Sequence, residues 1–193
     1  KMNQFNSAID RHSTGKKVLM LFILTNLVYA LMLLVTLPKV MEYSNGLKLL
    51  DMMPTGYDAA YIHSLFEILG EEGRHVYLYT QIPVDFVYPC LFGISYCLLL
   101  AYLLKKLNRL NSVYFYLCFL PLVAGTADYL ENIGIITMLQ SYPDLSQVLM
   151  SATNLFSIIK STSTTLIFVA LIILLLFLGI NFIKGRRATT NDS

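Results

Sequence analysis

Four long stretches of hydrophobic residues run along the chain, and polar segments separate them. They cover about residues 18–37, 82–104, 113–139 and 160–183. A helix of about 20 apolar residues is long enough to cross the hydrocarbon core of a membrane, which is about 30 Å thick. The pattern therefore predicts an all-α fold: a polytopic membrane protein with a bundle of four transmembrane helices, in which residues 1–193 form a single integral membrane domain.

The first and last spans are expected to have unusual ends. The first span follows a basic segment, as a signal sequence does, but no small-residue cleavage site follows it, so we expect an uncleaved helix that ends at Pro38. The helical pattern of the last span begins near Leu145, well before its apolar part, and runs to Ile183. At about 1.5 Å per residue, this helix is nearly twice as long as the membrane core is thick. Its first part is therefore expected to project, tilt or break.

The outer segment, residues 38–81, joins the first two spans and is too polar to cross a membrane. A turn signal over residues 54–56 precedes an expected helix over about 57–69, which ends at Gly70. A second helix is expected from about Arg74 into the second span. The apolar residues of the first helix recur on one side: Tyr61, Ile62, Leu65, Phe66 and Leu69. This spacing predicts an amphipathic helix on the membrane surface or on the mouth of the bundle.

Basic residues predict the orientation of the bundle. The N-terminal segment, the loop after the second span and the C-terminal segment hold ten of the fourteen Lys and Arg residues: Lys1, Arg11, Lys16, Lys17, Lys105, Lys106, Arg109, Lys184, Arg186 and Arg187. These three segments share one side of a four-span protein, and basic loops stay in the cytoplasm. We therefore expect a multi-pass protein of the cell membrane with both termini cytoplasmic and the outer segment extracytoplasmic.

The composition argues against several classes of function. The three cysteines, Cys90, Cys97 and Cys118, include no C-x-x-C pair, which disfavours a thiol oxidoreductase. The basic residues lie at the span ends as the orientation rule requires, so nucleic-acid binding is not expected. No Ser–His–Asp order, phosphate-binding glycine loop or H-E-x-x-H motif occurs, and the cofactor, if there is one, stays unknown.

Four charged residues lie inside the predicted spans: Asp85, Asp128, Glu131 and Lys160. A charge in the membrane costs at least about 2.5–3.5 kcal/mol, so intramembrane charges generally mark functional sites. Counted along the helices at about 1.5 Å per residue, all four lie near the outer face. Asp128, Glu131 and Asn132 are spaced i, i+3, i+4 and share one helix face. The sequence therefore predicts one ligand-binding cluster of Asp85, Asp128, Glu131, Asn132 and Lys160.

The predicted cluster contains more acid than base, because three carboxyl groups accompany one lysine. In a medium of low dielectric constant, this excess requires a bound proton or a bound cation. The alternative is a structural polar network that holds the helices together through hydrogen bonds of about 0.6–2 kcal/mol each.

A metal site is a weaker alternative. His63 and Glu67 are four residues apart on the amphipathic helix, a spacing that allows both to bind one ion. If that helix covers the bundle, they could meet Asp128 and Glu131. This pattern is common by chance, so no metal is assigned.

Two strings of residues resemble small bacterial four-span membrane proteins. The first combines Asp51-Met-Met-Pro-Thr-Gly-Tyr57 with Leu69-Gly-Glu-Glu-Gly-Arg74 and Tyr77, and the second is Asp128-Tyr-Leu-Glu-Asn132. The resemblance covers about half of the chain. It implies no activity and adds no catalytic residues.

Three functions follow from these observations. The first is an outward-facing acidic pocket that binds or transports a cation, a proton or a small amphipathic or lipid ligand. The second is a membrane-embedded enzyme that modifies a lipid or an isoprenoid and uses an acid pair for proton transfer. The third is an accessory subunit of a membrane complex. The expected partners are the lipid bilayer and either a second copy of the chain or another membrane subunit, because four spans are few for a transporter.

Overall fold

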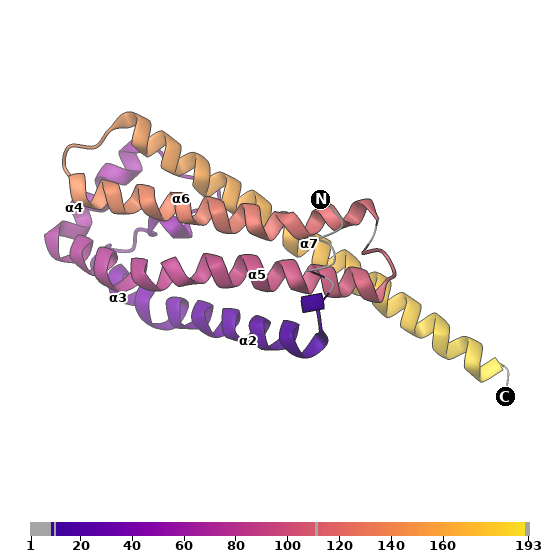
Figure 1. The fold of residues 1–193 in the computed structure, drawn as a ribbon. Helices are drawn as coiled ribbons and strands as arrows, with labels where there is room; N and C mark the ends of the chain where they lie inside the picture. The colour runs from indigo at the N-terminus through magenta and orange to yellow at the C-terminus, as the bar shows by residue number, and fades with distance from the viewer. Residues whose placement is uncertain (1–8, 10, 111, 192–193) are drawn as a thin grey trace.

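The computed structural model of the protein describes residues 9, 11–110 and 112–191, with side chains as far as Lys184. Lys1 and the side chains of Arg186 and Arg187, which contribute to the predicted orientation, lie outside this description. The described residues form no strand, and the all-α fold is confirmed (Figure 1). The helices are α2 (Gly15–Leu31), η1 (Met32–Thr36), α3 (Leu37–Met41), η2 (Leu50–Met52), α4 (Ala59–Val76), η3 (Tyr77–Gln81), α5 (Ile82–Lys106), η4 (Val113–Phe119), α6 (Leu120–Ser141) and α7 (Gln147–Asn191).

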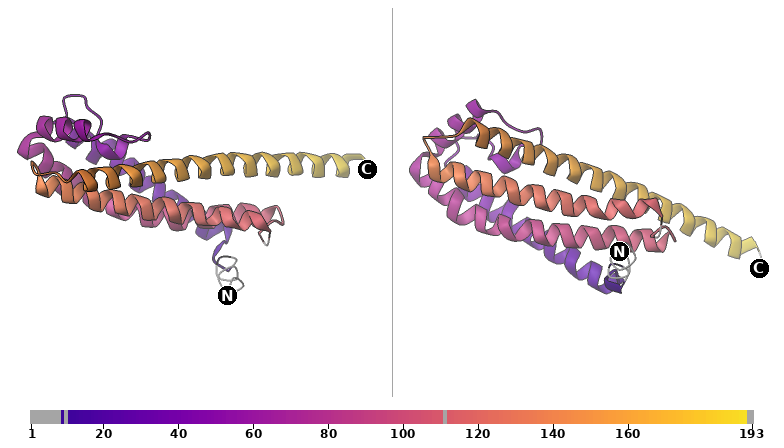
Figure 2. Two further views of the ribbon diagram at one scale, coloured as in Figure 1. Left: turned by 90° about the horizontal axis from the view of Figure 1, so that it is seen from above. Right: turned by 45° about the horizontal axis from the view of Figure 1, so that its top comes forward.

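Four continuous helical segments are long and apolar enough to cross a membrane, as the sequence predicts. They are Gly15–Met41, Ala59–Lys106, Val113–Ser141 and Gln147–Lys184. The long helices lie side by side in the order α2, α5, α6, α7 (Figure 2). Within this row α5 packs between α2 and α6, and α7 packs mainly on α6.

The first span does not end at Pro38, and the predicted boundary is wrong by one short turn. The helix widens into the π-helical turn η1 and then continues as α3 to Met41. In η1 the N–H of Leu37 bonds to the carbonyl of Met32, five residues back. A proline ring collides with the carbonyl four residues before it, and a wider turn just before the proline relieves that collision.

A π-helical turn before a proline also joins the outer segment to the second span. The π-helical turn η3 precedes Pro83, and in it the N–H of Ile82 bonds to the carbonyl of Tyr77. Helix α4 therefore runs on into α5 without a loop. Its one interruption is Gly70, whose φ of 63° and ψ of −173° end the first helical stretch where the sequence predicts. The helix resumes directly after Gly70 rather than near Arg74.

The first stretch of α4 is amphipathic, and it covers one end of the bundle. Asp58 caps it, accepting a hydrogen bond of 2.8 Å from the N–H of Tyr61. Its buried side belongs to a core that also contains residues of α6 and α7: Ile62, Leu65, Phe66 and Leu69. His63 and Glu67 are exposed. The idea that they meet Asp128 and Glu131 is therefore wrong, because the apolar side of α4 faces the bundle.

Two glycines of α6 allow its neighbours to approach closely. A Cβ atom at Gly125 would lie 2.7 Å from the Pro89 carbonyl oxygen of α5, and one at Gly134 would lie 2.1 Å from the Thr153 hydroxyl of α7. Asp128 and Glu131 lie between these two contacts on the same helix. The close approach on both sides brings the acids of α6 near α5 and α7 at one level of the bundle.

Helix α7 is continuous from Gln147, close to the predicted start at Leu145. Its first half packs on α6 and α4, and its last part extends beyond the bundle (Figure 1). Of the three outcomes expected for the first part of this helix, a break does not occur, and projection from the membrane or a tilt stays a prediction.

Candidate functional site

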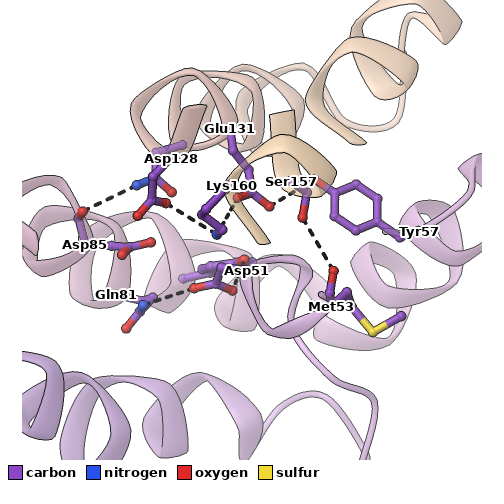
Figure 3. A network of polar contacts seen from close by, with 11 residues as sticks. Asp51, Met53, Tyr57, Gln81, Asp85, Asp128, Glu131, Ser157 and Lys160 are labelled. Carbon is purple, nitrogen blue, oxygen red and sulfur yellow. Dashed lines mark hydrogen bonds and ion pairs between the residues drawn. The ribbon is translucent and has the colours of Figure 1, made fainter. Parts of the chain in front are cut away.

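An ion-pair cluster joins α6 to α7, and Lys160 lies at its centre (Figure 3). The Lys160 ammonium lies 3.3 Å from Asp128 Oδ1 and forms a second ion pair with Glu131 Oε2. Glu131 is fully buried, and Asp128 is 6% exposed. These contacts follow from helix geometry, since Asp128 and Glu131 are three residues apart and share the side of α6 that faces α7. Three of the five residues predicted from sequence are thus in direct contact.

Asp85 and Asn132 lie beside this cluster, so all five predicted residues meet. The Asn132 amide donates to the backbone carbonyl of Asp85 at 3.4 Å. Asp85 is 2% exposed, and within the described part of the chain its Oδ2 has no hydrogen-bond partner. The same holds for Asn132 Oδ1. Two buried oxygen atoms therefore have the capacity to accept hydrogen bonds that the described residues do not fill.

A fourth acid, Asp51, belongs to the same site and was not predicted from the sequence. It lies in η2, within the outer segment, and both of its carboxyl oxygens are occupied. The Tyr77 hydroxyl donates to Oδ1 at 2.7 Å, and the Gln81 amide donates to Oδ2 at 3.0 Å. Thr36 donates to the amide oxygen of Gln81, which fixes the amide with its NH₂ group toward Asp51.

The two π-helical turns build this network, because η1 supplies Thr36 and η3 supplies both Tyr77 and Gln81. The spacing of Tyr77 and Gln81 is a sequence signal for a shared polar face. The sequence does not indicate that Asp51 lies at that face, because its two hydrogen-bond partners, Tyr77 and Gln81, are 26 and 30 residues further along the chain.

Residues 51–57 cover the cluster and are tied to α7 and α6. The backbone N–H of Tyr57 donates to Asn154 Oδ1 at 2.8 Å, and the Ser157 hydroxyl reaches the Met53 carbonyl at 3.5 Å. The Tyr57 hydroxyl lies 3.4 Å from Glu131 Oε1. Burial and the nearby Glu131 raise the pKa of Tyr57, so its hydroxyl stays protonated and acts as a donor.

A glycine is required at position 56 for residues 51–57 to pack over the ion-pair cluster. The φ of Gly56 is +85°, and a Cβ atom there would lie 2.3 Å from Asn154 Oδ1. Both the left-handed backbone and the close approach to α7 exclude a side chain. The turn predicted at residues 54–56 therefore contains the glycine at which the outer segment contacts α7.

A long cavity of about 1110 Å³ opens from the cluster and continues between α2, α5 and α7. Asp51, Asp85, Asp128 and Lys160 line one end. The far end is lined by Gly15 and Tyr102, and a Cβ atom at Gly15 would lie 3.2 Å from the Tyr102 hydroxyl oxygen. Aromatic residues line much of the length: Phe22, Tyr29, Tyr88, Phe92, Tyr96, Tyr102 and Phe168. The volume exceeds the usual range of about 300–1,000 Å³ for small-molecule sites.

The charged end of the cavity is acidic. Asp51, Asp85 and Asp128 line it directly, Glu131 lies behind them, and Lys160 is the one basic lining residue in the described part of the chain. The described residues include no group of three His, Cys, Asp or Glu side chains arranged to hold a metal ion. The arrangement can accept hydrogen bonds and positive charge from a bound molecule and enclose an apolar chain.

Comparisons of the chain with protein-family models, with curated proteins and with solved structures find no match.

Proposed function

We propose that this chain is a multi-pass protein of the cell membrane that binds an amphipathic, lipid-like molecule in the cavity between α2, α5 and α7. The polar head would lie at Asp85, Asp128 and Lys160, and the apolar tail would lie along the aromatic wall. The observation that carries this proposal is the shape of the cavity, which joins an acidic end to a long apolar stretch. A bare cation or a proton needs only the acidic end.

Membrane insertion is supported by the four apolar helical segments. Many large hydrophobic side chains on the outside of the bundle are exposed, such as Leu34 at 77% and Leu27 at 63%, and a bilayer would cover them. Both termini would be cytoplasmic, since the loops at that end carry most of the basic residues. The acidic end of the cavity would then open toward the outer leaflet.

A second candidate function is an enzyme that acts on the same bound lipid. The Oδ2 atom of Asp85 supports it, because a carboxyl oxygen that has no hydrogen-bond partner among the described residues and belongs to a group lining a cavity can take up or release a proton. Turnover of a bound lipid that stops in Asp85→Asn, while binding persists, would favour the enzyme over a binding protein.

The binding proposal is tested by blocking the cavity. Ser161 lines it on α7, and Ser161→Trp would fill part of its volume. Ser151→Trp is the matched control, because Ser151 is exposed on the same helix. The full-length protein, purified in detergent, is analysed by native mass spectrometry for lipid that co-purifies from the host membrane.

We expect a bound lipid with the wild-type protein and with Ser151→Trp, and at least a tenfold lower occupancy with Ser161→Trp. The proposal is wrong if the wild-type protein carries no lipid after reconstitution into native lipid extract, or if both variants retain it equally.

A further inference from the structure

The four acids of the site differ in whether they have partners. Asp128 and Glu131 pair with Lys160, and Asp51 accepts from Tyr77 and Gln81. Asp85 is the exception, since no described residue donates to its Oδ2 although the residue is 2% exposed. A buried carboxyl group without a donor is costly, and native structures rarely leave one. Because Asp85 also lines the cavity, its donor can come from a bound molecule.

The charge of the site indicates which donor fits. Lys160 offers one positive charge and already contacts two carboxyl groups, so it does not balance Asp85 as well. An anionic head group would meet Asp51, Asp85 and Asp128 at this end and be repelled. A hydroxyl group would donate a hydrogen bond to Asp85 but leave the excess negative charge in place. An ammonium group provides both the donor and the charge.

The walls next to Asp85 also suit a cation with an apolar chain. Tyr88, one turn along α5, stacks on Tyr29 of α2 with ring centroids 5.5 Å apart, and both rings line the cavity. Aromatic faces attract cations, more strongly where water is excluded. Beyond Tyr88 the cavity follows α5 as far as Leu103. Counted from Asp85, the stretch of α5 along the cavity spans roughly 27 Å of helix, more than the roughly 15 Å thickness of one leaflet's hydrocarbon.

We propose that the cavity binds a long-chain amine, with its ammonium group on Asp85 and its chain along the aromatic wall of α5. This inference rests on the proposed function, because it names the chemical class of the lipid-like molecule. It assigns Asp85 as the residue that selects the head group, while Lys160, Asp128 and Glu131 form the fixed ion pairs beside it.

The test compares three probes that share one chain length and differ in the head group: octadecylamine, octadecanol and octadecanoic acid. Full-length protein is placed in nanodiscs of phosphatidylcholine, and each probe is titrated while the change in tyrosine fluorescence on binding is followed. We expect the amine to bind at least tenfold more tightly than the alcohol, and the acid to bind most weakly.

Two variants test whether Asp85 is the residue that selects the amine over the alcohol. Asp85→Asn should lower the affinity for octadecylamine at least tenfold and that for octadecanol much less, because the amide oxygen of Asn still accepts a hydrogen bond but carries no charge. Glu67→Gln removes an exposed carboxylate from the same side of the protein, and it should change neither affinity if the amine does not simply gather at an acidic surface. If Asp85→Asn does not fold, the ranking of the three probes on the wild-type protein decides alone.

The possible failures are distinct. If the alcohol binds the wild-type protein as tightly as the amine, the cavity holds an amphiphile but the amine assignment is wrong. The same conclusion follows if Asp85→Asn keeps its preference for the amine. If none of the probes binds and Ser161→Trp retains as much host lipid as Ser151→Trp, the proposed function itself fails.

Discussion

Lys160 holds together a site whose other charged members are all acids. It contacts Asp128 and Glu131 from α7, and both carboxyl groups lie in the bundle interior. Removing one partner of a buried ion pair leaves the other charge uncompensated, which costs more than the pair contributed. The expected role of Lys160 in stability is thus separate from the binding role proposed for Asp85, and different measurements test each of them.

We expect Lys160→Met to lower the free energy of unfolding by about 3–5 kcal/mol, because Asp128 and Glu131 would lose their counter-charge. The measurement is thermal unfolding in detergent, followed by circular dichroism. Lys48→Met is the control, since Lys48 is exposed on the outer segment and its replacement should change stability by less than about 0.5 kcal/mol. Equal melting temperatures for the two variants would show that the ion pairs contribute little.

At the residue scale, sequence reasoning found the acids on helices and missed the acid in the outer segment. Asp128, Glu131 and Asn132 were predictable because a helix fixes which residues share a face. Asp51 was not, since its position depends on the path of a non-helical connection and on contacts with residues far along the chain. The free oxygen of Asp85 also escapes sequence reasoning, because spacing alone does not show which donors fall within reach.

At the scale of elements, small residues decide how closely the helices pack. The backbone of α6 approaches the Pro89 carbonyl of α5 at Gly125, and no side chain fits between them. Membrane helices associate through such close backbone contacts, since apolar side chains gain little by leaving lipid. The distance between α5 and α6 at Gly125 therefore sets the distance between Asp85 and Asp128 one turn away.

We expect Gly125→Ala to destabilise the bundle by about 1–3 kcal/mol, since its Cβ atom would lie too close to the Pro89 carbonyl oxygen, which cannot move freely. Gly179→Ala is the matched control on the projecting part of α7, where no atom lies within 4 Å of the added Cβ. That control should be neutral or stabilising by up to about 1 kcal/mol, because alanine favours helix. Thermal unfolding should show a lower melting temperature for Gly125→Ala but not for Gly179→Ala, and an equal loss in both variants would contradict the packing argument.

Helix boundaries near proline were the part of the fold that the sequence predicted least well. Proline generally ends or kinks a helix, so Pro38 predicted an end. The structure instead widens the preceding turn, and the helix continues for one more turn. This outcome depends on packing against η3 and on the Thr36–Gln81 hydrogen bond, both of which are contacts between distant segments.

At the scale of the whole molecule, the proposed orientation places the outer segment outside the cell and the loop between α5 and η4 inside. Cysteine accessibility tests this in a background in which Cys90, Cys97 and Cys118 are replaced by Ala. Glu72→Cys should react with a membrane-impermeant maleimide added to intact cells, whereas Arg109→Cys should react only after the membrane is opened. Labelling of Arg109→Cys in intact cells would show that the orientation is the opposite of the one proposed.

The paired wide turns η1 and η3 have a consequence for how insertions and deletions act on this protein. A π-helical turn is one residue longer than the α-helical turn it replaces. Deleting one residue within Tyr77–Gln81 would therefore leave an ordinary α-helical turn, with α4 still in register with α5, whereas deleting one residue from the α-helical stretch Gly73–Val76 would rotate the preceding part of α4 by about 100° relative to α5. After this second deletion the buried side of α4 would no longer meet α6 and α7. The wide turn η3 thus accommodates one residue more than an α-helical turn while the outer segment stays in register with the bundle.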